Sequence, residues 1–68
     1  AAMSAEHPDH VTVTHGMRGW FAVYMKWTDE CGGFYEPWQS HDFSHSSRAG
    51  AESDARAWAE AEEVEVRL

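Results

Sequence analysis

Seven of the nine aromatic residues in this 68-residue chain lie in one stretch, residues 20–39, with the sequence WFAVYMKWTDECGGFYEPWQ. Two segments of the stretch have strand-forming character, and a turn containing Gly32 and Gly33 separates them. Alternating apolar and polar residues are typical of a half-buried strand, and paired glycines allow the left-handed backbone of a tight turn. Residues 20–39 are therefore predicted to form a β-hairpin, around which the rest of the chain must fold.

The two faces of the first predicted strand, residues 20–28, differ in character. One face is wholly apolar and carries Phe21, Val23, Met25 and Trp27. The other face is mixed and carries Trp20, Ala22, Tyr24, Lys26 and Thr28. Because apolar strand residues pack against the core, we expect the wholly apolar face to lie under the helix.

The register of the predicted hairpin follows from its side chains. We expect Lys26 to lie opposite Glu36, since opposite charges stabilise a cross-strand pair. The same register places Trp27 opposite Tyr35, and Tyr24 opposite Trp38. Pro37 has no amide hydrogen to donate, so it is expected at a sheet edge or a bulge.

The remainder of the chain predicts one helix and one further strand. Residues 48–62 are rich in Ala, Glu and Arg, which are good helix formers, and Ser47 suits the N-cap position. Ala51, Ala55 and Trp58 share one helix face, and residues 64–68 alternate as in a final strand. The predicted fold class is α+β, a small antiparallel sheet of three to four strands with one helix packed on one face.

Residues 1–16 are small and polar and contain Pro8, so they are expected to be a flexible leader. Residues 11–14 read VTVT, and a short strand there is the alternative. Met17 could also be a native start, in which case the residues before it would be dispensable. Residues 17–68 are predicted to form a single ββαβ-type domain.

The length and the cysteine content bear on oligomeric state and location. A chain of 68 residues forms one domain of marginal stability, and Cys31 alone cannot make an intrachain disulfide. Homodimerisation is the expected additional source of buried area. The single cysteine, and the absence of a membrane-length apolar stretch or a signal-peptide pattern, indicate a cytoplasmic protein with no membrane partner.

The charge balance indicates which partners the chain can bind. Twelve acidic residues against five basic ones give a net charge of −7. Binding to a phosphate backbone needs Lys and Arg, so nucleic acid is disfavoured and a protein with a basic surface is favoured. The alternative is that the charge only keeps a small protein soluble.

No catalytic or metal-binding site is predicted. Cys31 lies in a turn, but nothing in the sequence places a base beside it, and the domain is too small for a large pocket. The histidines lack the spacing of a closed zinc site; they are His7, His10, His15, His41 and His45. We therefore predict a protein that is not an enzyme and that has no cofactor.

The mixed face of the hairpin carries the candidate partner-binding residues. With the apolar face against the helix, four aromatic side chains would be left toward solvent, and such a patch is typical of an interface. The candidate set adds two acidic residues to these four: Trp20, Tyr24, Phe34, Glu36, Trp38 and Asp42. Two alternatives are a cover formed by the N-terminal segment or the Phe43 region, and base stacking with a single-stranded nucleic acid.

Residues 18–68 resemble small orphan proteins encoded by bacteriophages of actinobacteria. The resemblance rests on Trp20, on GFYEPWQ at residues 33–39 and on WAEAE at residues 58–62. The order of strand, turn, strand and Ala-rich helix is also similar to HicB-like antitoxin domains, which carry a Pro-x-Leu-Pro-Gly type turn after the hairpin, where this chain reads QSHDF. The phage resemblance implies a small acidic protein that binds and inhibits a host or defence protein. The antitoxin resemblance implies a nucleic-acid-associated module as the alternative.

Overall fold

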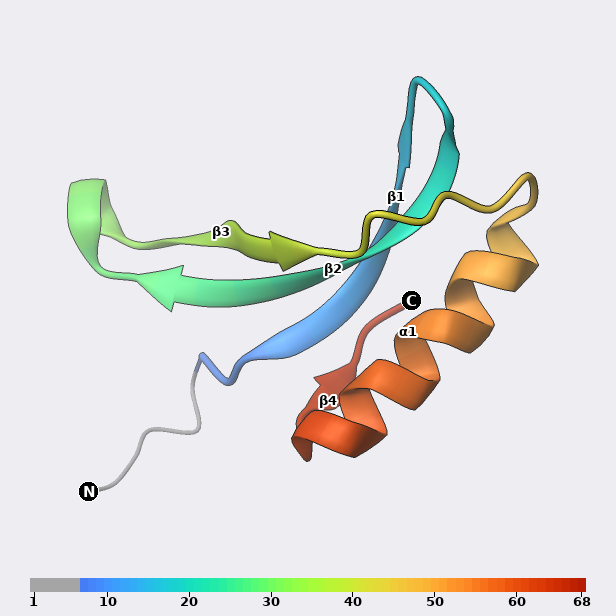
Figure 1. The fold of residues 1–68 in the computed structure, drawn as a ribbon. Coiled ribbons are helices and arrows are strands. Elements are labelled where there is room, and N and C mark those ends of the chain that lie inside the picture. Colours follow the sequence, from blue (N-terminus) through green and yellow to red (C-terminus); the bar gives the residue numbers. More distant parts are fainter. Residues whose placement is uncertain (1–6) are drawn as a thin grey trace.

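The computed structural model describes residues 7–68 as a four-stranded sheet with one helix on one of its faces (Figure 1). The strands are β1 (His10–Gly16), β2 (Gly19–Thr28), β3 (Phe34–Ser40) and β4 (Glu65–Val66), and the helix α1 is Arg48–Glu62. A single 3-10 turn, η1 (Glu30–Gly32), joins β2 to β3. The order in the sheet is β3-β2-β1-β4. The predicted α+β class is confirmed, and the sheet is mixed because β4 pairs parallel to β1 while the other pairs are antiparallel.

The strand β1 belongs to the interior of the sheet, with β2 on one side and β4 on the other. Only two residues, Met17 and Arg18, separate it from β2, and the register runs from Gly16 opposite Gly19 to His10 opposite Met25. The alternative of a short strand at residues 11–14 is therefore confirmed, and the strand is longer than predicted. The flexible leader predicted for residues 1–16 is wrong for residues 10–16. Its first six residues lie outside the described part of the chain. The domain therefore extends beyond the predicted bounds of residues 17–68, because it contains β1 in addition to the predicted ββαβ elements.

The hairpin of β2 and β3 has the predicted register for most of its length. Lys26 lies opposite Glu36 and Trp27 opposite Tyr35, as expected. Met25 faces Pro37 in the same register, and beyond this pair the register shifts, so that Tyr24 faces Gln39 rather than Trp38. The bulge comes at the proline, on an edge strand, where the missing amide hydrogen costs no ladder bond.

The helix begins and ends where the sequence predicts. Ser47 is its N-cap, with its hydroxyl accepting a hydrogen bond from the amide of Gly50, and the left-handed Glu63 follows its last turn. The face toward the sheet is an alanine stripe, Ala51, Ala55 and Ala59, of which all three are buried. A stripe of methyl groups lets the helix backbone approach the sheet closely.

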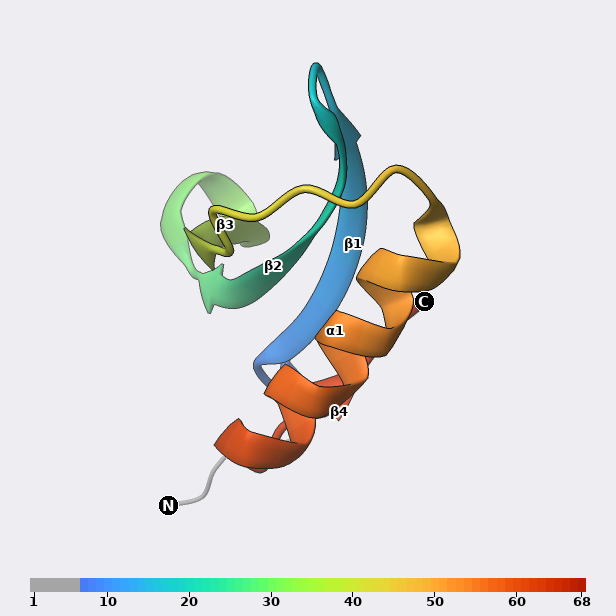
Figure 2. The same cartoon turned by 45° about the vertical axis from the view of Figure 1, so that its right-hand side comes forward.

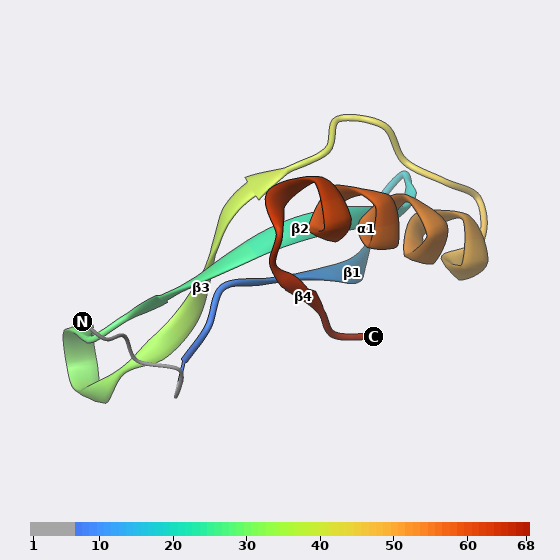
Figure 3. The same ribbon diagram turned by 90° about the horizontal axis from the view of Figure 1, so that it is seen from below.

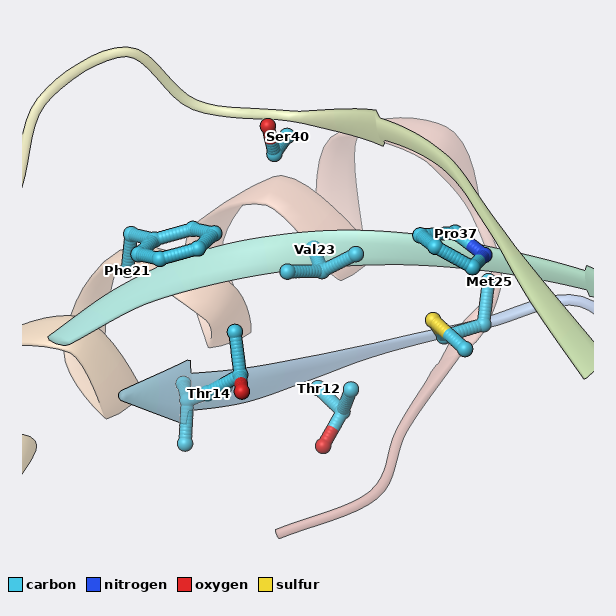
Figure 4. A pocket seen from close by; sticks show the side chains of 8 residues that line it. Thr12, Thr14, Phe21, Val23, Met25, Pro37 and Ser40 are labelled. Carbon is cyan, nitrogen blue, oxygen red and sulfur yellow. The ribbon is translucent and has the colours of Figure 1, made fainter. Parts of the chain in front are cut away.

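The helix packs on the opposite face of β2 from the one predicted. The core contains Ala22 and Tyr24 of β2 together with Val11 of β1, and Ala55 and Ala59 of α1 pack against them. Phe21, Val23 and Met25 point to the other side of the sheet, away from α1 (Figure 4). The reason is steric, since an alanine stripe can sit closely over Ala22 but not over a row of large side chains.

The helix does not extend over the whole sheet. Its main contacts are with β1, β2 and β4, and the main contacts of β3 are with β2. Figure 2 shows α1 running beside β1, and Figure 3 shows the far end of the β2–β3 hairpin extending beyond the helix. The helix thus does not cover two surfaces, namely the helix-side face of β3 and the opposite face of the sheet, where Val23 is nevertheless buried.

Candidate functional site

The helix-side face of β3 holds three exposed side chains that we call the β3 strip: Phe34, Glu36 and Trp38. Phe34 is 42% exposed and Trp38 is 58% exposed. Phe34 and Glu36 lie opposite Thr28 and Lys26, which fixes them on the same side of the sheet. Three of the six predicted partner-binding residues are therefore brought together on one edge strand.

Two neighbours hold the indole of Trp38 in place. The ammonium of Lys26 lies 4.4 Å from the centroid of the Trp38 ring, in a cation–π contact. The ring of Tyr24 meets Trp38 edge to face, with the centroids 5.6 Å apart. An aromatic side chain that is both exposed and held in one orientation loses little conformational entropy when it binds a partner.

The Tyr24 side chain is buried, so the prediction that it faces solvent is wrong. It is 8% exposed and belongs to the core beneath α1. Its hydroxyl donates a hydrogen bond of 3.0 Å to a carboxylate oxygen of Asp9. Burial, and then this hydrogen bond to Asp9, raise the pKa of the Tyr24 phenol above its ordinary value.

Trp20 lies apart from the β3 strip, at the start of β2. Its backbone amide donates to the carbonyl of His45 at 2.8 Å, and the amide of His45 donates back at 2.7 Å. The guanidinium of Arg48 lies 5.5 Å from the centroid of its ring, and the side chain is half-buried. Asp42 is exposed in the segment that follows β3. The structure therefore places neither residue in the β3 strip.

The uncovered side of the sheet forms a shallow hollow of about 400 Å³ that the sequence prediction assigned to the core. We call this surface the open face. Its lining residues are all uncharged: Thr12, Val13, Thr14, Phe21, Val23, Met25, Pro37 and Ser40. Of these, Val13 lies opposite Ala22 and packs against the core on the helix side, so it only borders the hollow. In Figure 4 the labelled side chains from β1 and β2 extend from the sheet on the side away from α1.

The segment that precedes β1 covers one end of the same side of the sheet. The imidazole of His7 stacks on Trp27 with ring centroids 3.6 Å apart. The hydroxyl of Tyr35 donates to the carbonyl of Pro8 at 3.0 Å. This cover lies at the η1 end of the hairpin, whereas the open face begins at Met25 and extends toward Phe21.

A second cluster ties the segment between β3 and α1 to the helix. His41 Nδ1 lies 2.7 Å from Asp54 Oδ2, and His45 Nε2 lies 3.6 Å from the same oxygen. The His41 ring stacks on Trp58 at 3.9 Å between centroids. Within residues 7–68, no group of three or more His, Cys, Asp or Glu side chains is arranged to hold a metal ion. These contacts hold the segment between β3 and α1 against the helix.

Cys31 is exposed in η1, where its backbone is left-handed with φ of 52°.

No family model, curated protein or solved structure matches the chain. Among the described residues, no helix combines the length and the apolar character that a membrane crossing requires. The β3 strip and the open face are the two surfaces of the described residues that are suited to binding.

Proposed function

We propose that the chain is a non-enzymatic protein-binding module that presents the β3 strip to its partner. The observation that supports this best is the environment of Trp38, which is more than half exposed and yet held by Lys26 and Tyr24. Tryptophan is the residue type most enriched among the side chains that dominate binding energy at protein interfaces. A tryptophan held in this way, without helix cover, is suited to insertion into a pocket on another protein.

The charge indicates the chemistry of the partner. The chain carries a net charge of −7, and Glu36 lies beside Trp38 in the strip. A partner with a basic rim around an apolar pocket would be attracted over distance and would then accept the indole. The finer proposal is a phage-encoded inhibitor that acts in the host cytoplasm on a host or defence protein. The resemblance to small phage proteins supports it.

The alternative, a HicB-like or nucleic-acid-associated module, has weaker support. Three of the five basic side chains are engaged within the molecule: Arg48 with Glu52, Arg67 with Glu65, and Lys26 with the Trp38 ring. Cations that already have partners release few counterions from a phosphate backbone. The protein-binding proposal is therefore preferred.

The test compares two substitutions of exposed apolar residues. The tagged chain is immobilised and exposed to an actinobacterial lysate as the native form, as Trp38→Ala and as Met17→Ala. Met17 lies in the turn between β1 and β2 and is fully exposed, so it controls for the loss of an exposed apolar side chain. Mass spectrometry then quantifies each retained protein.

We expect a basic protein that the native chain and Met17→Ala retain equally and that Trp38→Ala retains at least tenfold less. Loss of an interface tryptophan typically costs about 2 kcal/mol or more, which corresponds to roughly a 30-fold change in affinity. If Trp38→Ala retained the same proteins in the same amounts as the native chain, the β3 strip would not be the binding surface.

A further inference from the structure

The core beneath α1 is small for a domain of this size. Among residues 7–68, Val11 is the only large side chain that is completely buried, and every buried residue of the helix is an alanine. Burial of an alanine methyl group contributes much less than burial of a Phe or Met side chain. The larger apolar side chains of β2 instead line the open face, where α1 does not reach them.

The hollow of the open face differs from the rest of the surface because its lining lacks charge. None of its eight lining residues carries a charge, although the chain carries twelve acidic side chains. A basic partner would find no carboxylate there to pair with. The charged residues at the β4 end of this side, Glu65 and Arg67, form an ion pair with each other. Two copies of this acidic chain would repel each other through most surfaces, but much less through the uncharged hollows of their open faces.

The shape of the open face suits such a pairing. Sheets also pack face to face in many proteins, with side chains from the two inner faces interdigitating. The hollow between Phe21 and Met25 provides room for side chains of a facing sheet.

We propose that the open face binds a second copy of this chain and forms a symmetric dimer with two sheets inside and the two helices outside. The surface is continuous with the end that His7 and Pro8 cover, so the covered and paired regions together would shield this side of the sheet. The β3 strip lies on the helix side and stays accessible in the dimer. The proposal is therefore independent of the proposed function.

The test is the solution mass of the full chain by light scattering, from micromolar to millimolar concentration. The native chain is expected at twice its 7.7 kDa. Thr14→Glu places a carboxylate on the open face at an exposed position, so each copy would bring a charge to the interface. Ser53→Glu, at an exposed position of α1, adds the same charge on the helix side and is the matched control.

We expect Thr14→Glu to raise the dissociation constant at least tenfold, whereas Ser53→Glu and Trp38→Ala leave it unchanged. A native chain that remains monomeric over the whole range, or a folded Thr14→Glu chain that dimerises like the native one, would overturn the proposal.

A second measurement needs no substitution. Chains with ¹³C-labelled methionine methyl groups are mixed with unlabelled chains, and isotope-filtered NMR detects contacts between copies. The expected contacts join the methyl group of Met25 in one copy to the Phe21 ring or to Thr12 and Thr14 in the other. A dimer without contacts from Met25 would have its interface elsewhere, which would also overturn the proposal.

Discussion

Replacing Ala55 by leucine tests how closely the helix lies on the sheet. Ala55 is completely buried, in the same cluster as Val11, Ala22 and Tyr24. Leucine adds three carbon atoms at a position without free space, so the helix must move away or the strands must shift. Overpacking of this kind typically costs about 1–3 kcal/mol.

That cost is large relative to the stability of a chain of this length. At about 0.05–0.15 kcal/mol per residue, a domain of this size is stabilised by roughly 3–10 kcal/mol. For such small domains, 1 kcal/mol lowers the melting temperature by about 4–8 °C. We therefore expect Ala55→Leu to melt roughly 5–20 °C below the native chain.

Thermal unfolding followed by circular dichroism measures this effect, with Ala57→Leu as the control. Ala57 is exposed on the same helix, and alanine and leucine have similar helix propensities. The control is expected within about 0.5 kcal/mol of the native chain. Equal protein concentrations are needed, because dimerisation would make the melting temperature depend on concentration. If Ala55→Leu melted with the control, the close packing of α1 on Ala22 would be refuted.

Two further predictions concern β1. Deleting residues 1–16 removes an interior strand, so the shortened chain that starts at Met17 is expected to lose the cooperative unfolding transition seen by circular dichroism; a cooperative transition would mean that β1 is dispensable. Burial, and then the charge of Arg67, lower the pKa of His10 below 6.5. As the pH falls, the unfolded chain therefore binds a proton at this histidine before the folded chain does. The free energy of unfolding then decreases below about pH 6.5, by at most about 1.4 kcal/mol per pH unit from this group. His10→Gln is expected to flatten the difference in urea midpoint between pH 7 and pH 5, and an unchanged difference would contradict this role for His10.

Local features of the fold could be predicted because they depend on neighbouring residues. The bounds of α1, its Ser47 cap and the pairing of Lys26 with Glu36 all follow from propensity, capping or cross-strand charge. The position of the bulge also follows locally, since Pro37 cannot donate a ladder bond. The predicted pairing of Tyr24 with Trp38 failed because that bulge shifts the register beyond it.

The face that the helix covers was predicted wrongly because the choice depends on a strand outside the hairpin. The tight turn at Met17 and Arg18 pairs Val11 with Tyr24 and Val13 with Ala22. The apolar residues of β1 therefore share a face with the mixed set of β2, and the alanine stripe of α1 packs there. Counting apolar residues in β2 alone favoured the other face. Gly16 and Gly19 flank the two-residue turn at Met17 and Arg18, and this spacing is the sequence signal for the pairing of β1 with β2.

The wrong choice of face also affects part of the predicted site. Phe34, Glu36 and Trp38 lie together, because they come from one edge strand beyond the reach of the helix. Tyr24 became a core residue once the helix covered its face, and the open face went unrecognised because its residues were assigned to the core. Tertiary packing, rather than the pattern of any one strand, decides which surfaces remain available for binding.

Nuclear Overhauser effects from the methyl group of Ala55 report which face of β2 lies under the helix. Both proposed binding surfaces depend on that assignment. The structure predicts contacts from Ala55 to the Tyr24 ring and the Ala22 methyl group, and none to Phe21 or Met25. Contacts from Ala55 to the Phe21 ring in place of Tyr24 would show that the helix covers the open face, and would contradict both proposed binding surfaces.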